Sequence, residues 1–247
     1  MPYPKSLEGK VALVVGGAGG IGQAAGRMFA EAGAKVALTH RPGKAADITA
    51  LPGGGHAAFP ADVADTTSLL ILRAALKERF GRLDILVNAA GFTKPVPHAD
   101  LEALDDDLID RMFQVNWRGQ FAAIRTFAPM LQEHDDGLIV SISSIAAFTG
   151  VGSNIAYCAA KAGIDVMTKA VARALAPKVR VLAVSPGVVD TGFVPGRGSD
   201  FNEKTSASTP LKRIATPDDI AAAIVACATH LGFSTGTTIV VDGGRAL

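Results

Sequence analysis

Two side chains in the second half of the chain have the types and spacing of an acid–base pair. Tyr157 and Lys161 stand four residues apart, which puts them on one face of a helix predicted over Asn154–Ala176. A free phenol has a pKa of about 10, and a neighbouring ammonium group lowers that pKa because it favours the phenolate. The pair therefore predicts a tyrosine that exchanges a proton near neutral pH. Because this spacing is common by chance, its weight comes from Ser144, thirteen residues before Tyr157, and from a glycine loop near the N-terminus.

The glycine loop has the sequence Gly16-Gly17-Ala18-Gly19-Gly20-Ile21-Gly22, between a predicted strand, Val11–Val15, and a predicted helix, Gly20–Ala32. Glycines at a first strand-to-helix turn let the backbone approach a pyrophosphate, which the free N–H groups and the helix dipole then bind. The loop lacks the Gly-Lys-Ser/Thr ending of a mononucleotide P-loop. It therefore predicts a dinucleotide site.

The end of the second predicted strand, Lys35–Thr39, indicates which dinucleotide is bound. An Asp or Glu there would bind the free 2′-hydroxyl of the adenosine ribose, but His40 and Arg41 follow instead. The Arg41 guanidinium suits a 2′-phosphate. This favours NADP(H), with NAD(H) as the alternative if Arg41 is only a solvated loop residue. Asp62, after the third predicted strand, is either an acceptor for the adenine amino group or a helix N-cap.

Short β-branched runs alternate along the chain with longer Ala-rich stretches of helical period. This alternation predicts an α/β fold, a doubly wound parallel sheet of about seven strands (a Rossmann fold) with helices on both faces, and one domain over residues 1–247. Several strands are apolar on both sides, as a covered sheet requires. The other predicted strands are Ala57–Phe59, Leu83–Val87, Gly137–Ile142, Val179–Val184 and Thr237–Val241, and the other predicted helices are Thr66–Phe80, Leu101–Leu131 and Pro217–His230.

The segment 188–210 departs from this alternation, because it is rich in Gly, Pro, Ser and Thr. Such a loop in a compact domain is typical of a lid or a binding loop. We expect it to close a mainly apolar substrate pocket together with Phe92–His98 and Ala146–Asn154. Lys94 and Arg197 are candidates to pair with an anionic substrate, although isolated loop cations are usually solvated.

Composition argues against several classes of function. The 247 residues carry 24 Lys and Arg against 23 Asp and Glu, a net charge of +1, which argues against nucleic acid as a partner. Two cysteines, Cys158 and Cys227, cannot form a disulfide framework or a Cys₄ zinc site, and we predict no metal site. The first residues lack the apolar core of a secretory signal, and the apolar runs are too short to span a membrane. We therefore expect a cytoplasmic protein.

The order of these motifs resembles the short-chain dehydrogenase/reductase family, in its single-domain type, from about Leu7 to the C-terminus. The chain is similar to members such as 3-oxoacyl-carrier-protein reductases and sugar, polyol and small-ketone dehydrogenases. Besides the glycine loop, the resemblance is carried by Asp62-Val63, Asn88-Ala89-Ala90-Gly91, Asn116, the set Ser144, Tyr157 and Lys161, Pro186-Gly187 with Thr191, and Val240-Val241-Asp242-Gly243-Gly244.

The resemblance implies a role for each of these residues. Tyr157 is the general acid and base, Ser144 donates a hydrogen bond to the substrate oxygen, and Lys161 holds the nicotinamide ribose. Asn116 anchors a water that relays protons to Lys161. The implied cofactor contacts, in addition to Tyr157 and Lys161, are Gly16, Gly19, Gly20, Ile21, Gly22, His40, Arg41, Asp62, Val63, Asn88, Ala89, Gly91, Pro186, Gly187, Val189 and Thr191.

Three positions depart from the family's pattern. Val15 replaces a Thr whose hydroxyl braces the turn at Asn88, and Ala89 replaces a second Asn. Gly19 stands where many NADP-dependent members have Lys or Arg, which weakens the NADP(H) prediction.

The resemblance also implies a homotetramer and a small-molecule carbonyl or alcohol substrate. An acyl-carrier partner would need a basic patch at the pocket mouth, for which Arg125 and Arg173 are candidates. An NAD(H)-dependent sugar or polyol dehydrogenase and a dinucleotide-binding sensor without turnover are the alternative functions.

Overall fold

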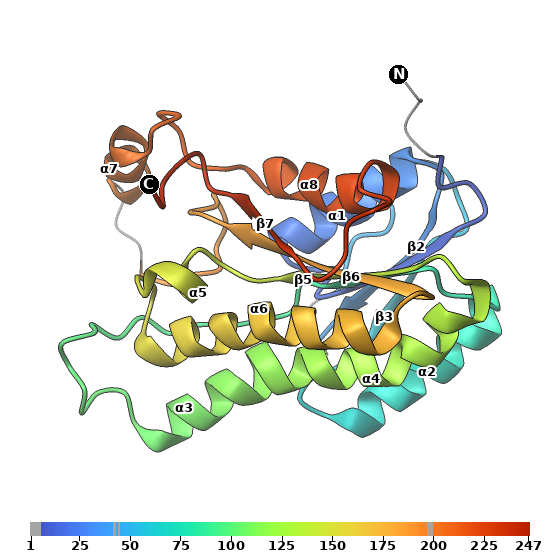
Figure 1. The fold of residues 1–247 in the computed structure, drawn as a ribbon, viewed down its shortest axis with the longest axis horizontal. Helices are drawn as coiled ribbons and strands as arrows, with labels where there is room; N and C mark the ends of the chain where they lie inside the picture. The colour runs from blue at the N-terminus through green and yellow to red at the C-terminus, as the bar shows by residue number, and fades with distance from the viewer. Residues whose placement is uncertain (1–5, 42, 44, 197–199) are drawn as a thin grey trace.

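The computed structural model describes residues 6–41, 43, 45–196 and 200–247, and a seven-stranded parallel sheet forms its centre (Figure 1). The strand order is β3-β2-β1-β4-β5-β6-β7. The doubly wound parallel fold predicted from the alternating pattern is confirmed. The strands are β1 (Val11–Val15), β2 (Lys35–His40), β3 (Ala57–Pro60), β4 (Ile85–Asn88), β5 (Gly137–Ile142), β6 (Val179–Pro186) and β7 (Thr238–Val241).

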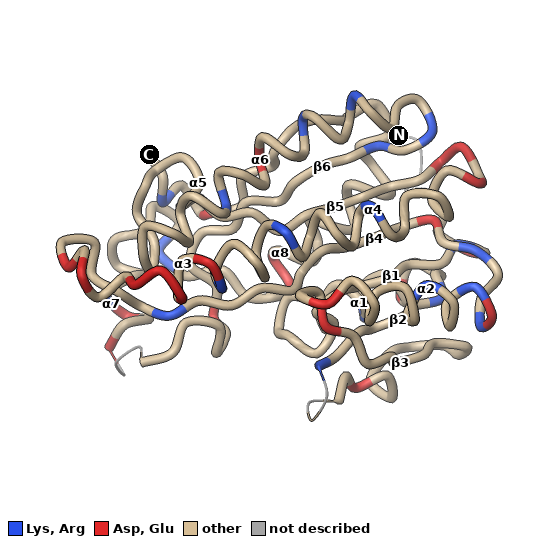
Figure 2. The backbone as a smooth tube through the Cα atoms, turned by 90° about the horizontal axis from the view of Figure 1, so that it is seen from below, with Lys and Arg blue, Asp and Glu red and all other residues tan. Residues whose placement is uncertain are grey.

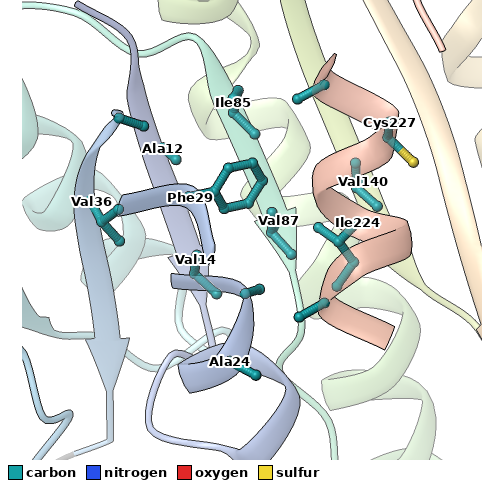
Figure 3. Packing of buried hydrophobic residues seen from close by; sticks show 14 of the residues in the cluster. Ala12, Val14, Ala24, Phe29, Val36, Ile85, Val87, Val140, Ile224 and Cys227 are labelled. Carbon is teal, nitrogen blue, oxygen red and sulfur yellow. The ribbon is translucent and has the colours of Figure 1, made fainter. Parts of the chain in front are cut away.

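Helices cover both faces of the sheet (Figure 1). Alternate strand residues point to opposite sides, so one buried cluster joins the sheet to α1 (Gly20–Glu31) and α8 (Pro217–Thr229), around Phe29 (Figure 3). A second cluster joins it to α2 (Thr66–Phe80), α4 (Gly119–Leu131) and α6 (Ile155–Leu175). Both cysteines are buried and unpaired. No helix in the described ranges has the length and apolar character to cross a membrane.

The sheet reverses its order between β1 and β4. The chain runs from β1 outward to β3 and then returns to place β4 on the other side of β1. In such sheets, ligands bind in the crevice at the carboxyl ends of the strands where the order reverses. Val15 at the end of β1 pairs with Asn88 at the end of β4, so the glycine loop and the turn after Asn88 lie at that crevice.

The long helix differs from its predicted bounds of Leu101–Leu131. It begins at α3 (Asp106–Phe113), because the Asp105 carboxylate accepts a hydrogen bond from the Leu108 amide at 2.7 Å and caps the helix there. A π-helical turn, η1 (Gln114–Arg118), then connects α3 to α4. Because α3 begins only at Asp106, the chain from β4 to Asp105 is a loop, and this loop can form a wall of the crevice.

Three short elements were not predicted from the sequence. The lid segment contains a helix, α7 (Phe201–Ser208), where only a loop was expected. The others are α5 (Ala146–Thr149), before α6, and a 3₁₀ turn, η2 (Gln132–His134), after α4.

Candidate active site

The N-terminal turns of α6 present Tyr157 and Lys161 together. The Asn154 side chain caps this helix by accepting a hydrogen bond from the Tyr157 amide at 2.7 Å. Lys161 Nζ lies 5.6 Å from the centre of the Tyr157 ring. The same nitrogen donates to the Ile142 carbonyl oxygen at the end of β5, at 2.7 Å. The helix cap and this bond to the sheet fix the positions of both side chains.

Lys161 is a buried cation, with only 3% of the residue exposed. Burial lowers the pKa of its ammonium group from 10.5 to about 8, and the carboxylate of Asp165, one turn further along α6, acts in the opposite direction and raises it. Asp165 is itself held by β7, because its Oδ1 accepts a hydrogen bond from the Thr238 hydroxyl at 3.1 Å. With a pKa of about 8, Lys161 remains mostly charged at neutral pH.

Two serines follow β5, and the first of them contacts α6. The Ser143 hydroxyl donates to the Lys161 carbonyl oxygen at 3.3 Å, which ties the end of the strand to α6. Ser144 Oγ accepts a hydrogen bond from the Ala146 amide at 3.2 Å. A hydroxyl that accepts in this way still has its own proton to donate to another acceptor.

Asn116 is fully buried within the π-helical turn. Its Oδ1 accepts from the Phe92 amide at 3.2 Å, and its Nδ2 donates to the carbonyl oxygens of Phe92 and Met112, both at 3.0 Å. A Cβ atom added to Gly91 would lie only 2.7 Å from Asn116 Oδ1. The amide of Asn116 therefore fastens the loop that follows β4, and Gly91 provides the space for it.

The glycine loop has the form that a bound pyrophosphate requires. Gly16 has a positive φ of +87°, and a Cβ atom on Gly22 would lie 2.3 Å from the Gly16 carbonyl oxygen. The Gly16 amide donates to the Thr39 hydroxyl at 2.9 Å. No side chain caps α1, and the amides of Gly20, Ile21 and Gly22 donate to none of the described residues. These free N–H groups at an exposed helix N-terminus fit an anion.

The segment after β6 reaches the same helix end. A Cβ atom on Gly20 would lie 2.9 Å from Thr191 Cγ2. Gly187 packs equally closely against Asp242, and Val189 forms a β-bridge with Ala215. Of the predicted cofactor residues after β6, Thr191 is thus brought against the glycine loop, and Gly187 and Val189 are held in the segment that leads to it.

Comparison with known proteins agrees with this geometry. A family model described as Enoyl-(Acyl carrier protein) reductase matches residues 16–246. The chain is 34% identical to a putative ketoacyl reductase of the granaticin polyketide synthase of Streptomyces violaceoruber, over 97% of both chains. It is 36% identical to the D-threitol dehydrogenase of Mycolicibacterium smegmatis, over 98% of this chain and 94% of the other. A short-chain dehydrogenase/reductase from Serratia marcescens superposes with a TM-score of 0.87 at 33% identity, over 98% of this chain and all of the other.

The chain belongs to the short-chain dehydrogenase/reductase family. Relatives in this family are named as dehydrogenases and reductases, so the protein is an NAD(P)-dependent oxidoreductase that acts on alcohol or carbonyl groups. The resemblance inferred from the order of the motifs is therefore confirmed.

The residues predicted to contact the adenosine half of the cofactor lie at the ends of β2, β3 and β4. His40 is the last residue of β2, and Arg41 follows it, exposed and without an ion pair to any described residue. Asp62 Oδ1 accepts from the Ala64 amide at 2.8 Å, whereas Asp65 caps α2. The N-cap alternative for Asp62 is therefore wrong. Val63 is buried.

The turn at Asn88 is held differently from the family's usual pattern. The Ala89 amide donates to the Val15 carbonyl oxygen at 2.8 Å, which continues the pairing of β1 with β4, and Val15 has no hydroxyl to add to it. Asn88 Nδ2 lies 3.5 Å from the Ser141 hydroxyl, and its buried Oδ1 has no partner among the described residues.

The mouth of the site is apolar close to Tyr157. The Phe193 ring lies 6.2 Å from the Tyr157 ring, centre to centre. The loop after β4 is joined to the start of α6, because the Val96 amide donates to the Ser153 carbonyl oxygen at 2.8 Å and Asn154 Nδ2 donates to the Lys94 carbonyl oxygen at 2.8 Å. Arg197, the other candidate for an anionic substrate, lies outside the described residues.

Sequence reasoning missed Thr39 and Asp165. Asp165 stands four residues after Lys161, so the helical spacing that identified Lys161 could also have identified it. Thr39 was passed over because nothing in a strand's sequence shows which loop its hydroxyl will reach. Within the described ranges, no three His, Cys, Asp or Glu side chains gather as metal ligands do.

Proposed function

We propose that the protein transfers a hydride between NADP(H) and the carbonyl or secondary alcohol of a small substrate, with Tyr157 as general acid and base. The observation that carries the proposal is the buried Lys161 ammonium, 5.6 Å from the Tyr157 ring and bonded to the end of β5, next to Ser144. A desolvated cation at that distance stabilises a phenolate strongly, because the low local dielectric does not screen it. The whole chain, 1–247, acts as one domain in this proposal.

Proton transfer, substrate binding and cofactor binding fall to different residues of the site. Tyr157 donates its proton to the substrate oxygen in reduction and accepts it in oxidation, and Ser144 donates a hydrogen bond to the same oxygen. Lys161 binds the ribose hydroxyls of the nicotinamide nucleoside and keeps its charge beside the phenol. Asn116 Nδ2 donates to the carbonyl oxygens of Phe92 and Met112, and Oδ1 accepts from the Phe92 amide. One lone pair of Oδ1 is left to accept from a water that relays protons to Lys161. The bound nicotinamide supplies the hydride.

Two features support NADP(H) as the preferred cofactor. Arg41 stands exposed at the end of β2 without an ion pair to a described residue, and the strand ends carry no acidic residue at this position. Gly19 and Gly20 leave the N-terminus of α1 open to the pyrophosphate, which NADP(H) and NAD(H) share, so these glycines do not distinguish the two cofactors. Val63, Ala89 and Gly91 form the wall against which the adenosine half lies.

The surroundings of the mouth favour an uncharged substrate that is free in solution. Between positions 92 and 111 the chain has six acidic residues against two basic ones, and the acidic ones are all exposed. Figure 2 shows Asp and Glu gathered over α3 and near α7. Arg173 lies twelve residues beyond Lys161, about 18 Å along α6, and Arg125 lies over Phe121 on α4. Neither provides the basic patch that an acidic carrier protein needs.

A specific observation supports the second candidate, a sugar or polyol dehydrogenase that uses NAD(H). The relative from Mycolicibacterium smegmatis is named a D-threitol dehydrogenase, and Gly19 lacks the cation that many NADP-dependent members have. A sensor without turnover is less well supported, because Asn116, Ser144, Tyr157 and Lys161 are all present.

Exposed apolar faces support a homotetramer, and two free cysteines support a reducing compartment such as the cytoplasm. Phe113, Phe121, Ile155 and Val166 expose 37–66% of their area on α3, α4 and α6, and Phe233 is fully exposed near β7. Apolar faces of this kind pack against other subunits. Burial raises the pKa of both thiols, Cys227 to about 11, which keeps them unreactive.

The test is turnover of uncharged ketones with NADPH, followed by loss of absorbance of the reduced nicotinamide, for the native protein and Tyr157→Phe. We expect the variant to lose kcat by at least about a thousandfold, since it retains the ring but not the proton. Its dissociation constant for NADPH should stay within about twofold, because the glycine loop is untouched. Comparable turnover by the variant would remove Tyr157 as the proton donor, and no turnover by the native protein would favour the sensor.

A further inference from the structure

The C-terminal residues form a compact hook beyond β7. The Asp242 carboxylate accepts hydrogen bonds from the amides of Gly244 and Ala246, at 2.9 and 2.8 Å, and so bends the chain back on itself. Gly243 and Gly244 adopt positive φ angles of +65° and +84°, which glycine adopts without strain. The hook therefore has one defined shape, which directs Arg245 to one side.

Arg245 reaches the C-terminal end of α7 in the lid segment. Its Nη1 lies 3.0 Å from the Ser208 hydroxyl, 3.4 Å from the Thr209 hydroxyl and 3.5 Å from the Thr205 carbonyl oxygen. The Thr205 carbonyl oxygen already accepts from the Thr209 amide and from the hydroxyls of Ser208 and Thr209. The contact therefore depends mainly on the 3.0 Å bond to the Ser208 hydroxyl, and a cation at this end of a helix is also favoured by the helix dipole. Arg245 therefore caps α7 from outside the lid.

A main-chain contact reinforces this cap. The Leu211 amide, just after the lid, donates to the Gly243 carbonyl oxygen at 3.1 Å. A Cβ atom on Gly243 would lie 3.0 Å from Thr209 Cγ2, and one on Gly244 would lie 3.1 Å from Pro210. The hook is packed closely against the end of the lid segment.

The other end of α7 is joined to the cofactor side of the crevice. Asn202 Nδ2 donates to Asp190 Oδ1 at 3.0 Å, and Asp190 directly precedes Thr191, which lies against Gly20 in the glycine loop. Phe193, two residues further, lies over Tyr157. The bond between Asn202 and Asp190 thus connects α7 to the segment that carries Phe193.

We propose that Arg245 is a positioning residue for the substrate: it holds α7 in place, and through α7 it sets the cover that Phe193 forms over Tyr157. This inference rests on the proposed function, since it concerns the carbonyl substrate of the same site. Arg245 contacts neither the glycine loop nor Tyr157, so cofactor binding and the proton transfer itself do not depend on it. The loss of a single charge-assisted contact to α7 then affects mainly substrate affinity.

The test compares Arg245→Gln and Arg245→Lys with the native protein on one uncharged ketone and NADPH. For Arg245→Gln we expect KM for the ketone to rise by about tenfold, with kcat and the dissociation constant of NADPH within about twofold, because a charged hydrogen-bond donor at the helix end is lost. Arg245→Lys keeps the cation and should recover part of this change. Trypsin should cleave after Lys204 in α7 faster in Arg245→Gln than in the native protein.

Arg79→Gln is the matched control, because Arg79 also donates to a backbone carbonyl, that of Gly55 at 3.1 Å, far along the chain from the lid. It should leave KM and the cleavage after Lys204 unchanged. An unchanged KM in Arg245→Gln refutes the inference. A rise in KM that comes with equal losses of cofactor affinity and melting temperature refutes it too, because it indicates a purely structural role. If the native protein turns over no ketone, the proposed function fails instead, and the cleavage rate still reports whether Arg245 holds α7.

Discussion

Arg41 is the side chain on which the cofactor preference depends. Its exposed guanidinium directly follows β2, where a 2′-phosphate is bound bidentately by the same fork of donors that suits a carboxylate. Arg41→Asp replaces this cation with a group that repels phosphate and accepts a hydrogen bond from a free 2′-hydroxyl. We expect the dissociation constant of NADPH divided by that of NADH to rise by about 100-fold, or roughly 3 kcal/mol. Both constants are measured by fluorescence titration.

The control for this prediction is Arg79→Asp, which makes the same change of charge at a distant exposed arginine. If both variants shift the ratio equally, only the net charge matters and Arg41 is a solvated loop residue. A shift confined to Arg41→Asp supports its contact with the phosphate.

At the residue scale, the sequence predicted which side chains gather but not the state in which they are held. Tyr157 and Lys161 lie on one face of any helix because they are four residues apart, so the sequence alone predicted that they lie together. The pKa of Lys161 is lowered to about 8 mainly by burial, which depends on how deeply α6 packs on the sheet, and no local pattern contains that depth. The same holds for Asn116, whose amide is occupied by main-chain groups 24 residues and four residues away in the sequence.

Among the elements, β2 pairs with β1 and β3 and also binds the glycine loop. Its residue Thr39 holds the glycine loop twice: the hydroxyl accepts from the Gly16 amide at 2.9 Å, and the carbonyl oxygen accepts from the Ala18 amide at 3.2 Å. Thr39→Val keeps the shape but removes the first acceptor, in a side chain that is 2% exposed. Leaving the Gly16 amide unpaired should lower the free energy of unfolding by about 1–3 kcal/mol, measured in urea, and weaken NADPH binding.

Thr39→Ser keeps the hydroxyl and serves as the control, so it should retain most of the cofactor affinity. If Thr39→Val binds NADPH as tightly as the native protein does, the loop holds its shape without β2. If Thr39→Ser, which keeps the hydroxyl, weakens binding as much as Thr39→Val does, the effect is not specific to the hydroxyl and the packing of the side chain is responsible.

The elements that periodicity predicted well are those whose apolar faces meet the sheet. The start of α3 was misplaced because the decisive interaction is a cap by Asp105 inside an acidic run, where several residues have the same type. α7 was missed because its composition is that of a loop, and because a contact with Arg245, 37 residues after Ser208, supports it. Long-range contacts of this kind have no signature in a local window.

For the whole molecule, the net charge of +1 conceals an uneven distribution. Acidic residues gather over α3 and near α7 (Figure 2), at the mouth of the proposed site. Like charges at a mouth slow the arrival of an anion, and salt weakens this effect over a screening length of about 8–10 Å. The substrate class can therefore be tested with two molecules that carry the same reacting group and differ in charge.

A matched pair is the acetoacetyl thioester of N-acetylcysteamine, which is uncharged, and that of coenzyme A, which is anionic. We expect kcat/KM with NADPH to be about tenfold higher for the uncharged thioester at low ionic strength, and only the anionic one to improve as salt is added. The triple variant Glu102→Gln, Asp107→Asn and Asp110→Asn should improve the anionic substrate alone. Asp135→Asn should change neither, because Asp135 lies just before β5, at the amino ends of the strands and away from the crevice, and Asn tolerates its φ of 51°. A preference for the coenzyme A thioester that weakens with salt would instead show that cations guide the substrate, and would return an acyl-carrier partner to first place.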